Sequence, residues 1–321
     1  MKVLVTDHVF AHLDVERSIL EPLGAELVEA PGTSEAELIE AVSDADAMLV
    51  CYAKVTKPVV DAAADAGVRI MSRYGIGFDN IDIDAATERD VLVTYVPDYC
   101  LDDVADHAMT LLLMLARRAH QAALAVRDGE WAVPHGEVHR LQGRRLALIG
   151  TGGIGRRMID RALGFGVEVV GFDPYLDPWD IEAEKVESFE EAIAEADFIS
   201  LHVPLTDETR HLINAESIAS MNRTPIVINT ARGPLVAMDD AAAALDSGQL
   251  GGIGLDVTEI EPPPEDHPLR THPRAVLTPH MGFYSIEAVQ ELQRRAAEEI
   301  ARSLRDEAPD RPVNPEVLET K

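Results

Sequence analysis

The sequence predicts an α/β protein with two doubly wound parallel sheets, one domain being inserted into the other. Strand-like and helix-like segments alternate from residue 2 onward, and this alternation is typical of parallel strands joined by helices. A glycine-rich turn follows a short apolar strand in the middle of the chain. The last helix-like stretch, 285–304, has too little chain after it for another domain. We therefore expect this stretch to return to the first domain and to pack there.

The first domain is expected to contain five strands. Apolar segments predict them at 2–6, 25–29, 47–51, 68–72 and 91–94. Helix-like segments at 15–23 and 35–41 separate the first three of these strands. Because the connections are helical, the strands should be parallel.

The glycine-rich turn has the pattern of a dinucleotide-binding site. Gly150, Gly152 and Gly155 have G-x-G-x-x-G spacing, and a helix-like segment and a second strand follow them. In this pattern the first glycine makes the tight turn, the second lets the backbone approach a pyrophosphate and the third lets helix and strand pack closely. The helix N-terminus provides free N–H donors and a positive dipole for the phosphates. Asp173 ends the second strand, where its carboxylate can accept hydrogen bonds from ribose hydroxyls.

The rest of the central region completes a domain around this turn. A long helix-like segment is expected at 100–119, after Pro97, and six strands are expected at 145–149, 167–172, 198–202, 226–229, 253–256 and 275–278. Six strands suit a complete Rossmann domain. The prediction is a Rossmann dinucleotide-binding domain (99–285) inserted into a flavodoxin-like substrate domain (1–98 and 286–321), with hinges near 98–101 and 284–290.

Length and cysteine content restrict the class of protein. The 321 residues suffice for two domains, each with its own core. We find no segment that resembles a signal peptide or a membrane span, so a cytoplasmic location is expected. Cys51 and Cys100 are the only cysteines, which predicts neither a disulfide framework nor a metal site.

The charge is strongly acidic. The chain has 57 acidic and 28 basic residues, of which 5 are lysines, and its formal net charge is −29. Such a field repels nucleic acids and anionic membrane surfaces, so neither is expected as a partner. Acidic residues spread along a chain that is poor in lysine are typical of salt-adapted proteins. A GC-rich genome, which favours arginine and aspartate codons, is the alternative explanation.

Three further side chains follow successive predicted strands of the central domain. Arg232, Glu261 and His280 lie in the segments after 226–229, 253–256 and 275–278. Taken alone, Arg232 could be a surface salt-bridge partner, Glu261 a solvated loop acid and His280 a strand cap. Strand ends, however, are where open α/β sheets bind ligands. Reduction of a carbonyl needs a cation that orients the substrate and a proton donor that titrates near neutrality. Arginine and a carboxylate-paired histidine have these properties.

The ordered motifs along nearly the whole chain resemble those of the D-isomer-specific 2-hydroxyacid dehydrogenases. The matching segments are Arg73–Asp82, Val104–Ala108, Gly129–Trp131, the glycine turn, His202–Thr206, Asn229–Gly233, Gly254–Val257 with Glu261–Pro262, His267–Leu269 and Thr278–His280. This resemblance implies an NAD-dependent reductase of small 2-ketoacids. It also implies that Arg232 binds the substrate, that His280 is the proton donor and that Glu261 is paired with it.

The resemblance extends to the ligand-binding positions and to the oligomeric state. The implied substrate-binding residues are Tyr52, Gly75, Ile76, Gly77, Arg232 and Phe283. The implied cofactor-binding residues are Gly150, Gly152, Gly153, Ile154, Gly155, Asp173, Val203, Pro204, Thr230, Ala231, Asp256 and Gly282. The segment Arg127–Trp131 lies on the arm that forms the dimer interface in the family, so a homodimer is expected.

Two departures from the family pattern affect this interpretation. The family often has arginine where this chain has Gly153, so one side-chain contact to the pyrophosphate is absent. Phe283 follows His280 as an aromatic does in the C-terminal binding protein branch, which includes transcriptional corepressors. Phe283 is interpreted either as one wall of the substrate pocket or as ordinary core packing.

Other functions and cofactors are compatible with parts of the sequence. An NAD(H)-sensing, corepressor-like scaffold with vestigial catalysis is the alternative function, although the intact Arg232, Glu261 and His280 and the acidic surface argue against it. Formate dehydrogenase, a relative of this family, is a further alternative. Enzymes of that type carry glutamine where this chain has Glu261, which argues against this function. NAD is expected rather than NADP because Asp173 would repel a 2′-phosphate and Pro174-Tyr175 follow it without an arginine.

Overall fold

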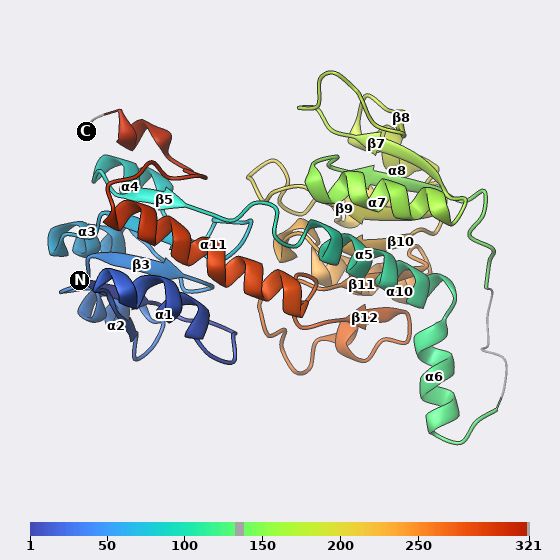
Figure 1. Cartoon of the computed structure of the whole chain (residues 1–321). Coiled ribbons are helices and arrows are strands. Elements are labelled where there is room, and N and C mark those ends of the chain that lie inside the picture. The colour runs from blue at the N-terminus through green and yellow to red at the C-terminus, as the bar shows by residue number, and fades with distance from the viewer. Residues whose placement is uncertain (132–137, 320–321) are drawn as a thin grey trace. The chain divides into compact units, whose positions relative to one another are not determined.

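The computed structural model describes residues 1–131 and 138–319, and the chain divides into two compact units (Figure 1). Met1–Tyr99 and Ser285–Lys321 form one unit, which we call the terminal unit. Cys100–Tyr284 forms the other, the central unit. Each unit has its own parallel sheet with helices on both faces, which confirms the predicted fold class.

The terminal unit contains a five-stranded parallel sheet. Its strands are β1 (Lys2–Val5), β2 (Glu26–Glu29), β3 (Ala47–Val50), β4 (Ile70–Arg73) and β5 (Leu92–Thr94). Their spatial order is β2-β1-β3-β4-β5, with all pairs parallel. This is the flavodoxin-like order, in which the winding direction reverses between β1 and β3. Ligands of such sheets bind at the C-terminal edge beside that point.

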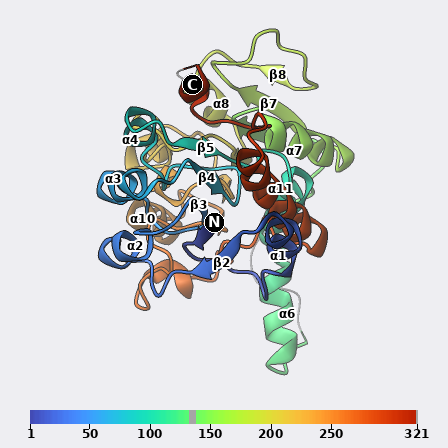
Figure 2. The same cartoon turned by 60° about the vertical axis from the view of Figure 1, so that its left-hand side comes forward.

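Helices cover both faces of the terminal sheet (Figure 2). One face packs against α1 (Asp14–Leu20) and α11 (Ile286–Leu304). The other packs against α2 (Glu35–Ala41), α3 (Lys57–Ala66) and α4 (Ile83–Glu88). Short 3₁₀ turns η1 (Glu21–Leu23) and η4 (Pro315–Leu318) complete the unit. Since α11 is the last long helix of the chain, its packing here agrees with the predicted return of 285–304.

The central unit contains a seven-stranded parallel sheet. Its strands are β6 (Arg145–Ile149), β7 (Glu168–Phe172), β8 (Glu184–Lys185), β9 (Phe198–Leu201), β10 (Ile226–Asn229), β11 (Gly252–Leu255) and β12 (Ala275–Leu277). The order β8-β7-β6-β9-β10-β11-β12 is the Rossmann order with one added strand. Six strands were predicted and β8 was not, because its two exposed, charged residues carry no apolar signal.

Helices also cover both faces of the central sheet. One face packs against α5 (Leu101–Ala116) and α7 (Gly153–Gly164), and the other packs against α8 (Phe189–Ala194) and α10 (Met238–Ser247). The remaining short elements are α9 (Ala215–Ala219), η2 (Gly233–Leu235) and η3 (Pro268–Arg270). The helix expected at 100–119 ends at Ala116, and α6 (Ala119–Arg127) begins after Arg118, whose φ is +50°. Figure 1 shows α6 extending from the body of the unit, and α6 has no buried residues.

No helix in residues 1–131 or 138–319 combines the length and the apolar character that a membrane span requires.

Candidate active site

The three glycines of the turn after β6 have different steric surroundings. Gly150 has a φ of +88°, and a Cβ there would lie 2.5 Å from the His202 carbonyl oxygen. A Cβ on Gly155 would lie 2.3 Å from the Gly150 carbonyl oxygen. By contrast, a Cβ on Gly152 would meet nothing within 4 Å. Backbone contacts therefore require glycine at 150 and 155, whereas the space over Gly152 is open for a ligand.

Asp173 connects the end of β7 to this turn. Its Oδ2 accepts hydrogen bonds from the Thr151 N–H at 2.8 Å and from the Thr151 hydroxyl at 3.0 Å. Its Oδ1 accepts one from the Tyr175 N–H at 3.0 Å. The carboxylate thus holds the glycine turn while it lies at the position that contacts a ribose in this fold.

Helix α7 starts at Gly153, so its N-terminal N–H groups and the positive end of its dipole lie at the turn. Ile154 occupies the next position of the same helical turn. A Cβ on Gly153 would lie 3.1 Å from Leu101 Cδ1. A larger side chain at 153 would require a small shift of the Leu101 side chain.

Asp256, after β11, is a buried carboxylate with several donors. It accepts hydrogen bonds from the Thr278 hydroxyl at 2.6 Å, the Met281 N–H at 2.9 Å and the Gly282 N–H at 2.7 Å, and His107 Nε2 lies 3.3 Å away. Burial alone would raise the pKa of Asp256, but hydrogen bonds from His107, Thr278 and the two backbone N–H groups outweigh it and lower that pKa. The group is therefore an anion that fixes the segment after β12.

The loop after β10 is shaped by Asn229, which is fully buried. Its side-chain oxygen accepts a hydrogen bond from the Ala231 N–H at 3.0 Å, and its amide donates to the Arg232 carbonyl at 2.8 Å. A Cβ on Gly233 would lie 1.9 Å from the Thr258 carbonyl oxygen, so this loop touches the loop after β11. The Arg232 guanidinium donates to the Ala231 carbonyl at 2.8 Å. The Thr230 hydroxyl is buried and has no hydrogen-bond partner in the described chain.

His280 and Glu261 form a pair within this unit. The Nδ1 of His280 lies 2.8 Å from Oε2 of Glu261, and Oε1 of Glu261 accepts a hydrogen bond from the Thr258 N–H at 3.1 Å. The backbone of His280 has a φ of +50°, and its N–H donates to the Asp256 carbonyl at 2.8 Å. Since Nδ1 is engaged by the carboxylate, Nε2 is the atom through which His280 can exchange a proton with a ligand. A cavity of about 470 Å³ opens beside the pair.

The structure brings most of the predicted central-unit residues to one edge of the sheet. Arg232, Glu261 and His280 lie on the loops after the neighbouring strands β10, β11 and β12. Phe283 is half-buried, and its ring packs edge-on against that of His280 at 6.4 Å between centroids. Val203 and Pro204 follow β9, and Val203 would meet a Cβ on Gly150 at 2.8 Å.

In the terminal unit, the predicted carboxylate-binding loop Gly75–Gly77 follows β4. Gly75 has a φ of +139°, and its carbonyl accepts a hydrogen bond from the Val96 N–H at 3.1 Å. The N–H groups of Ile76 and Gly77 donate to no acceptor in the part of the chain that the structure describes. Adjacent N–H groups without an acceptor form a site suited to an anion.

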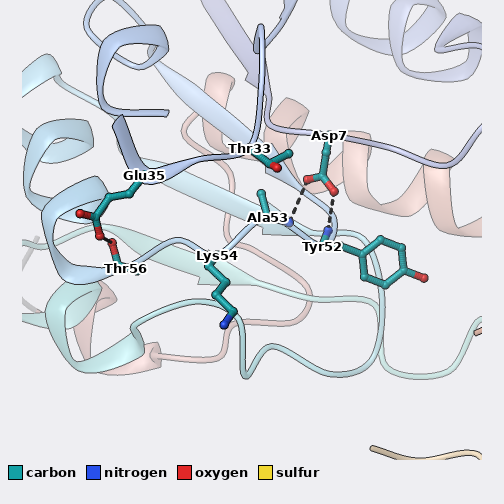
Figure 3. Close-up of a pocket in the computed structure, with 7 residues that line it drawn as sticks. All are labelled: Asp7, Thr33, Glu35, Tyr52, Ala53, Lys54 and Thr56. Carbon is teal, nitrogen blue, oxygen red and sulfur yellow. Dashed lines mark hydrogen bonds between the residues drawn. The ribbon is translucent and has the colours of Figure 1, made fainter. Parts of the chain in front are cut away.

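Tyr52 follows β3 at the same edge of the terminal sheet. The N–H groups of Tyr52 and Ala53 donate to the two carboxylate oxygens of Asp7 at 2.8 and 3.1 Å. Figure 3 shows these bonds and the Tyr52 ring pointing away from Asp7. A cavity of about 420 Å³ beside this loop is also lined by Thr33, Lys54 and Thr56. Asp7 therefore holds the Tyr52 loop.

Sequence reasoning assigned no role to the residues that support the site. They include Asp7, His107, Thr151, Asn229 and Thr258. Two of them carried a usable signal. Asp7 follows the first predicted strand, and Asn229 ends the fourth predicted strand of the central domain. Thr151 and Thr258 act through backbone N–H groups, and His107 reaches Asp256 with its imidazole from α5, a contact that depends on the folded geometry.

Known proteins are similar to this chain over most of its length. Residues 109–282 match the family model described as D-isomer specific 2-hydroxyacid dehydrogenase, NAD binding domain. The chain is 39% identical over 318 residues to the D-3-phosphoglycerate dehydrogenase of Methanocaldococcus jannaschii, covering 98% of this chain and 59% of that one. It is 36% identical over 297 residues to the glyoxylate reductase of Thermofilum pendens, covering 90% of this chain and 87% of that one.

A solved structure is similar over nearly the whole chain. The crystal structure of the TT0316 protein from Thermus thermophilus superposes with a TM-score of 0.89 at 36% identity. The similarity covers 98% of this chain and all of that chain. Both units thus have counterparts within one known protein.

Proposed function

Because this chain belongs to the D-isomer specific 2-hydroxyacid dehydrogenase family, we propose that it is an NAD-dependent reductase of small 2-ketoacids. Two of the similar proteins are named glyoxylate reductase and hydroxypyruvate reductase, at 87% and 97% coverage of their lengths. The chain covers only 59% of the longer phosphoglycerate dehydrogenase, so we do not propose that protein's substrate for it.

The observation that carries the proposal is the 2.8 Å contact between His280 Nδ1 and Glu261 Oε2 on the loops beside Arg232. The hydrogen bond between Nδ1 and the carboxylate fixes the ring orientation. The proton on Nε2 is then available to the oxygen of a carbonyl as that oxygen becomes an alkoxide. The Arg232 guanidinium can bind the substrate's carboxylate and keto oxygens with its planar set of donors.

The central unit fits a dinucleotide, which would supply the hydride when bound. The open space over Gly152 and the start of α7 suit a pyrophosphate. Asp173 suits a ribose, and the unpaired buried hydroxyl of Thr230 requires a partner that a bound ligand would provide. Thr230, Ala231, Asp256 and Gly282 lie on the loops after β10, β11 and β12, where we place the nicotinamide. The central unit is thus proposed as the cofactor domain.

The terminal unit is proposed as the substrate domain. The unengaged N–H groups of Ile76 and Gly77 would bind the substrate carboxylate. Tyr52 would contact the substituent at the far end of the ketoacid, and Phe283 is proposed as a further substrate-binding residue of the central unit. A homodimer is proposed through α6 and the following segment, because Leu124, Val126 and Trp131 expose 46%, 48% and 91% of their surfaces.

The test is NADH oxidation by the purified protein with glyoxylate, hydroxypyruvate, pyruvate, phenylpyruvate and 3-phosphohydroxypyruvate. We expect turnover with at least one of these 2-ketoacids and no reduction of NAD by formate. Binding of NADH without turnover of any 2-ketoacid would contradict the proposal and would favour the scaffold function. Sedimentation velocity should show a dimer, and Trp131→Glu should shift it toward the monomer.

A further inference from the structure

A buried polar cluster lies beneath the loop that begins at Tyr74. The Glu16 carboxylate on α1 accepts a hydrogen bond from the Tyr74 hydroxyl at 2.8 Å. It also accepts from the Gln293 amide on α11, at 3.1 Å to one oxygen and 3.0 Å to the other. The exposed fractions of Glu16, Tyr74 and Gln293 are 0%, 1% and 4%. Three separate segments of the terminal unit thus meet at one carboxylate.

This carboxylate has no charged partner. Within the described chain, Glu16 forms no ion pair, and its donors are the neutral hydroxyl and amide. Burying a carboxylate without a cation is costly, and an apolar side chain of similar size would fill the space at lower cost. Burial raises the pKa of the Tyr74 phenol well above its usual range, and the Glu16 carboxylate adds to this. Tyr74 therefore remains a donor to Glu16 throughout the neutral range.

The cluster connects directly to the substrate loop. Tyr74 is the residue before Gly75, and its N–H donates to the Val50 carbonyl at 2.8 Å at the end of β3. Its ring packs edge-on against Phe10 at 5.0 Å between centroids. Above this anchored residue, the Ile76 and Gly77 N–H groups have no acceptor in the described chain. Tyr74 is thus fixed by its backbone, its ring and its hydroxyl immediately before the two N–H groups.

We propose that Glu16, Tyr74 and Gln293 are positioning residues that hold the Gly75–Gly77 loop in the conformation that binds the substrate carboxylate. The proposal rests on the proposed function for the identity of the ligand. The alternative is that the cluster only contributes to the stability of the terminal unit. The two explanations differ in what happens to substrate affinity when stability is restored.

The first variant is Tyr74→Phe, which removes one oxygen atom and leaves the ring in place. We expect KM for the 2-ketoacid to rise about fivefold to tenfold, the range of one net hydrogen bond. The rate kcat should stay within about twofold, because the loop binds the ground state and transition state alike. The Kd of NADH should not change. Amide exchange of Tyr74 and Val96, whose N–H groups donate to the Val50 and Gly75 carbonyls, should become faster.

The second variant, Tyr74→Phe with Glu16→Gln, separates positioning from stability. In Tyr74→Phe the buried Glu16 carboxylate keeps only the Gln293 amide as a donor within the described chain. Replacing this carboxylate with an amide removes the poorly solvated group, so Tm should rise relative to the single variant. KM should stay raised because the bond to the loop is still missing. The matched control is Glu299→Gln on α11, the helix that also carries Gln293. The buried Glu299 carboxylate accepts a hydrogen bond from the Asp310 N–H at 3.1 Å. The control should change Tm but neither KM nor the exchange of the Tyr74 and Val96 amides.

A Tyr74→Phe protein with unchanged KM and unchanged exchange of the Tyr74 and Val96 amides would overturn the positioning role. A KM that recovers together with Tm in the double variant would also overturn it, as would a comparable rise in KM in Glu299→Gln. If the wild-type protein reduces no 2-ketoacid, the proposed function fails. The exchange measurement then decides whether the cluster holds the loop.

Discussion

The C-terminal edges of the two sheets present different groups to a ligand. In the central unit, the side chains of Arg232, Glu261 and His280 carry the proposed chemistry. In the terminal unit, the groups suited to an anion are the backbone N–H groups of Ile76 and Gly77, and the side chains lie behind them. A side chain can be removed by one substitution, whereas a backbone group can only be moved. We therefore expect substitution of the His280–Glu261 pair to lower kcat, and substitutions behind the terminal edge to raise KM.

The sharpest contrast comes from His280→Ala. We expect kcat for ketoacid reduction to fall by ~10²–10⁴, the usual contribution of a positioned general acid. The Kd of NADH, measured by fluorescence titration, should change little. Near-normal kcat across the pH range would mean that the proton comes from another group, and the comparison between the two edges would then lose its basis.

Cofactor choice tests the central edge alone. Asp173 already accepts three hydrogen bonds from Thr151 and Tyr175, and a 2′-phosphate would bring a second anion beside it. Repulsion of this kind in a partly buried site is worth on the order of 1–3 kcal/mol. We therefore expect kcat/KM with NADH to exceed that with NADPH by about tenfold to a hundredfold. Equal values would refute this role of Asp173.

The buried His202 should make the free energy of unfolding of the protein depend on pH. Its imidazole lies 2.8 Å from the Ser200 hydroxyl, and burial lowers its pKa from 6.5 to about 4. Between these values the unfolded chain binds a proton that the folded chain does not, so the free energy of unfolding falls as pH decreases from 6.5 to 4. The slope is at most ~1.4 kcal/mol per pH unit. Urea unfolding should show that His202→Gln loses this part of the slope, whereas parallel curves would exclude it.

Salt should affect the surface without affecting the clusters at either edge. With a net charge of −29, repulsion within the folded chain is strong at low ionic strength, and molar salt screens it. Tm should rise between ~0.05 and ~3 M KCl, as the Debye length falls from above ~10 Å to below ~3 Å. A flat or falling curve would reject salt adaptation and would leave codon bias as the explanation for the composition.

The sequence predicted well what local sterics and strand ends determine. Gly150 and Gly155 could be identified because a Cβ at either position would collide with a backbone oxygen, and such constraints repeat at fixed spacing. Arg232 and His280 could be proposed because each follows a predicted strand of the same sheet. The site residues of the central edge can be proposed from a sequence because the proposed ketoacid reduction requires particular residue types.

The terminal edge was predictable only from the family resemblance. Nothing in the residue types Gly-Ile-Gly indicates that two N–H groups lack acceptors, because this depends on folded geometry. The cluster behind the loop joins Glu16 to Tyr74 across 58 positions and to Gln293 across 277 positions. A glutamate in a short helix ordinarily indicates a solvated face, so its burial could not be expected. The same applies to β8, whose two exposed, charged residues pair with β7 through the backbone.

The central claim is that hydride moves from the nicotinamide to the keto carbon of a 2-ketoacid. The most direct measurement uses NADH deuterated at C4 with the best ketoacid of the panel, followed by mass spectrometry and chiral analysis of the product. The account predicts a 2-hydroxyacid of D configuration with one deuterium at C2, formed by the wild-type protein and formed ~10²–10⁴ times more slowly by His280→Ala. NADH binding without any labelled 2-hydroxyacid would contradict it.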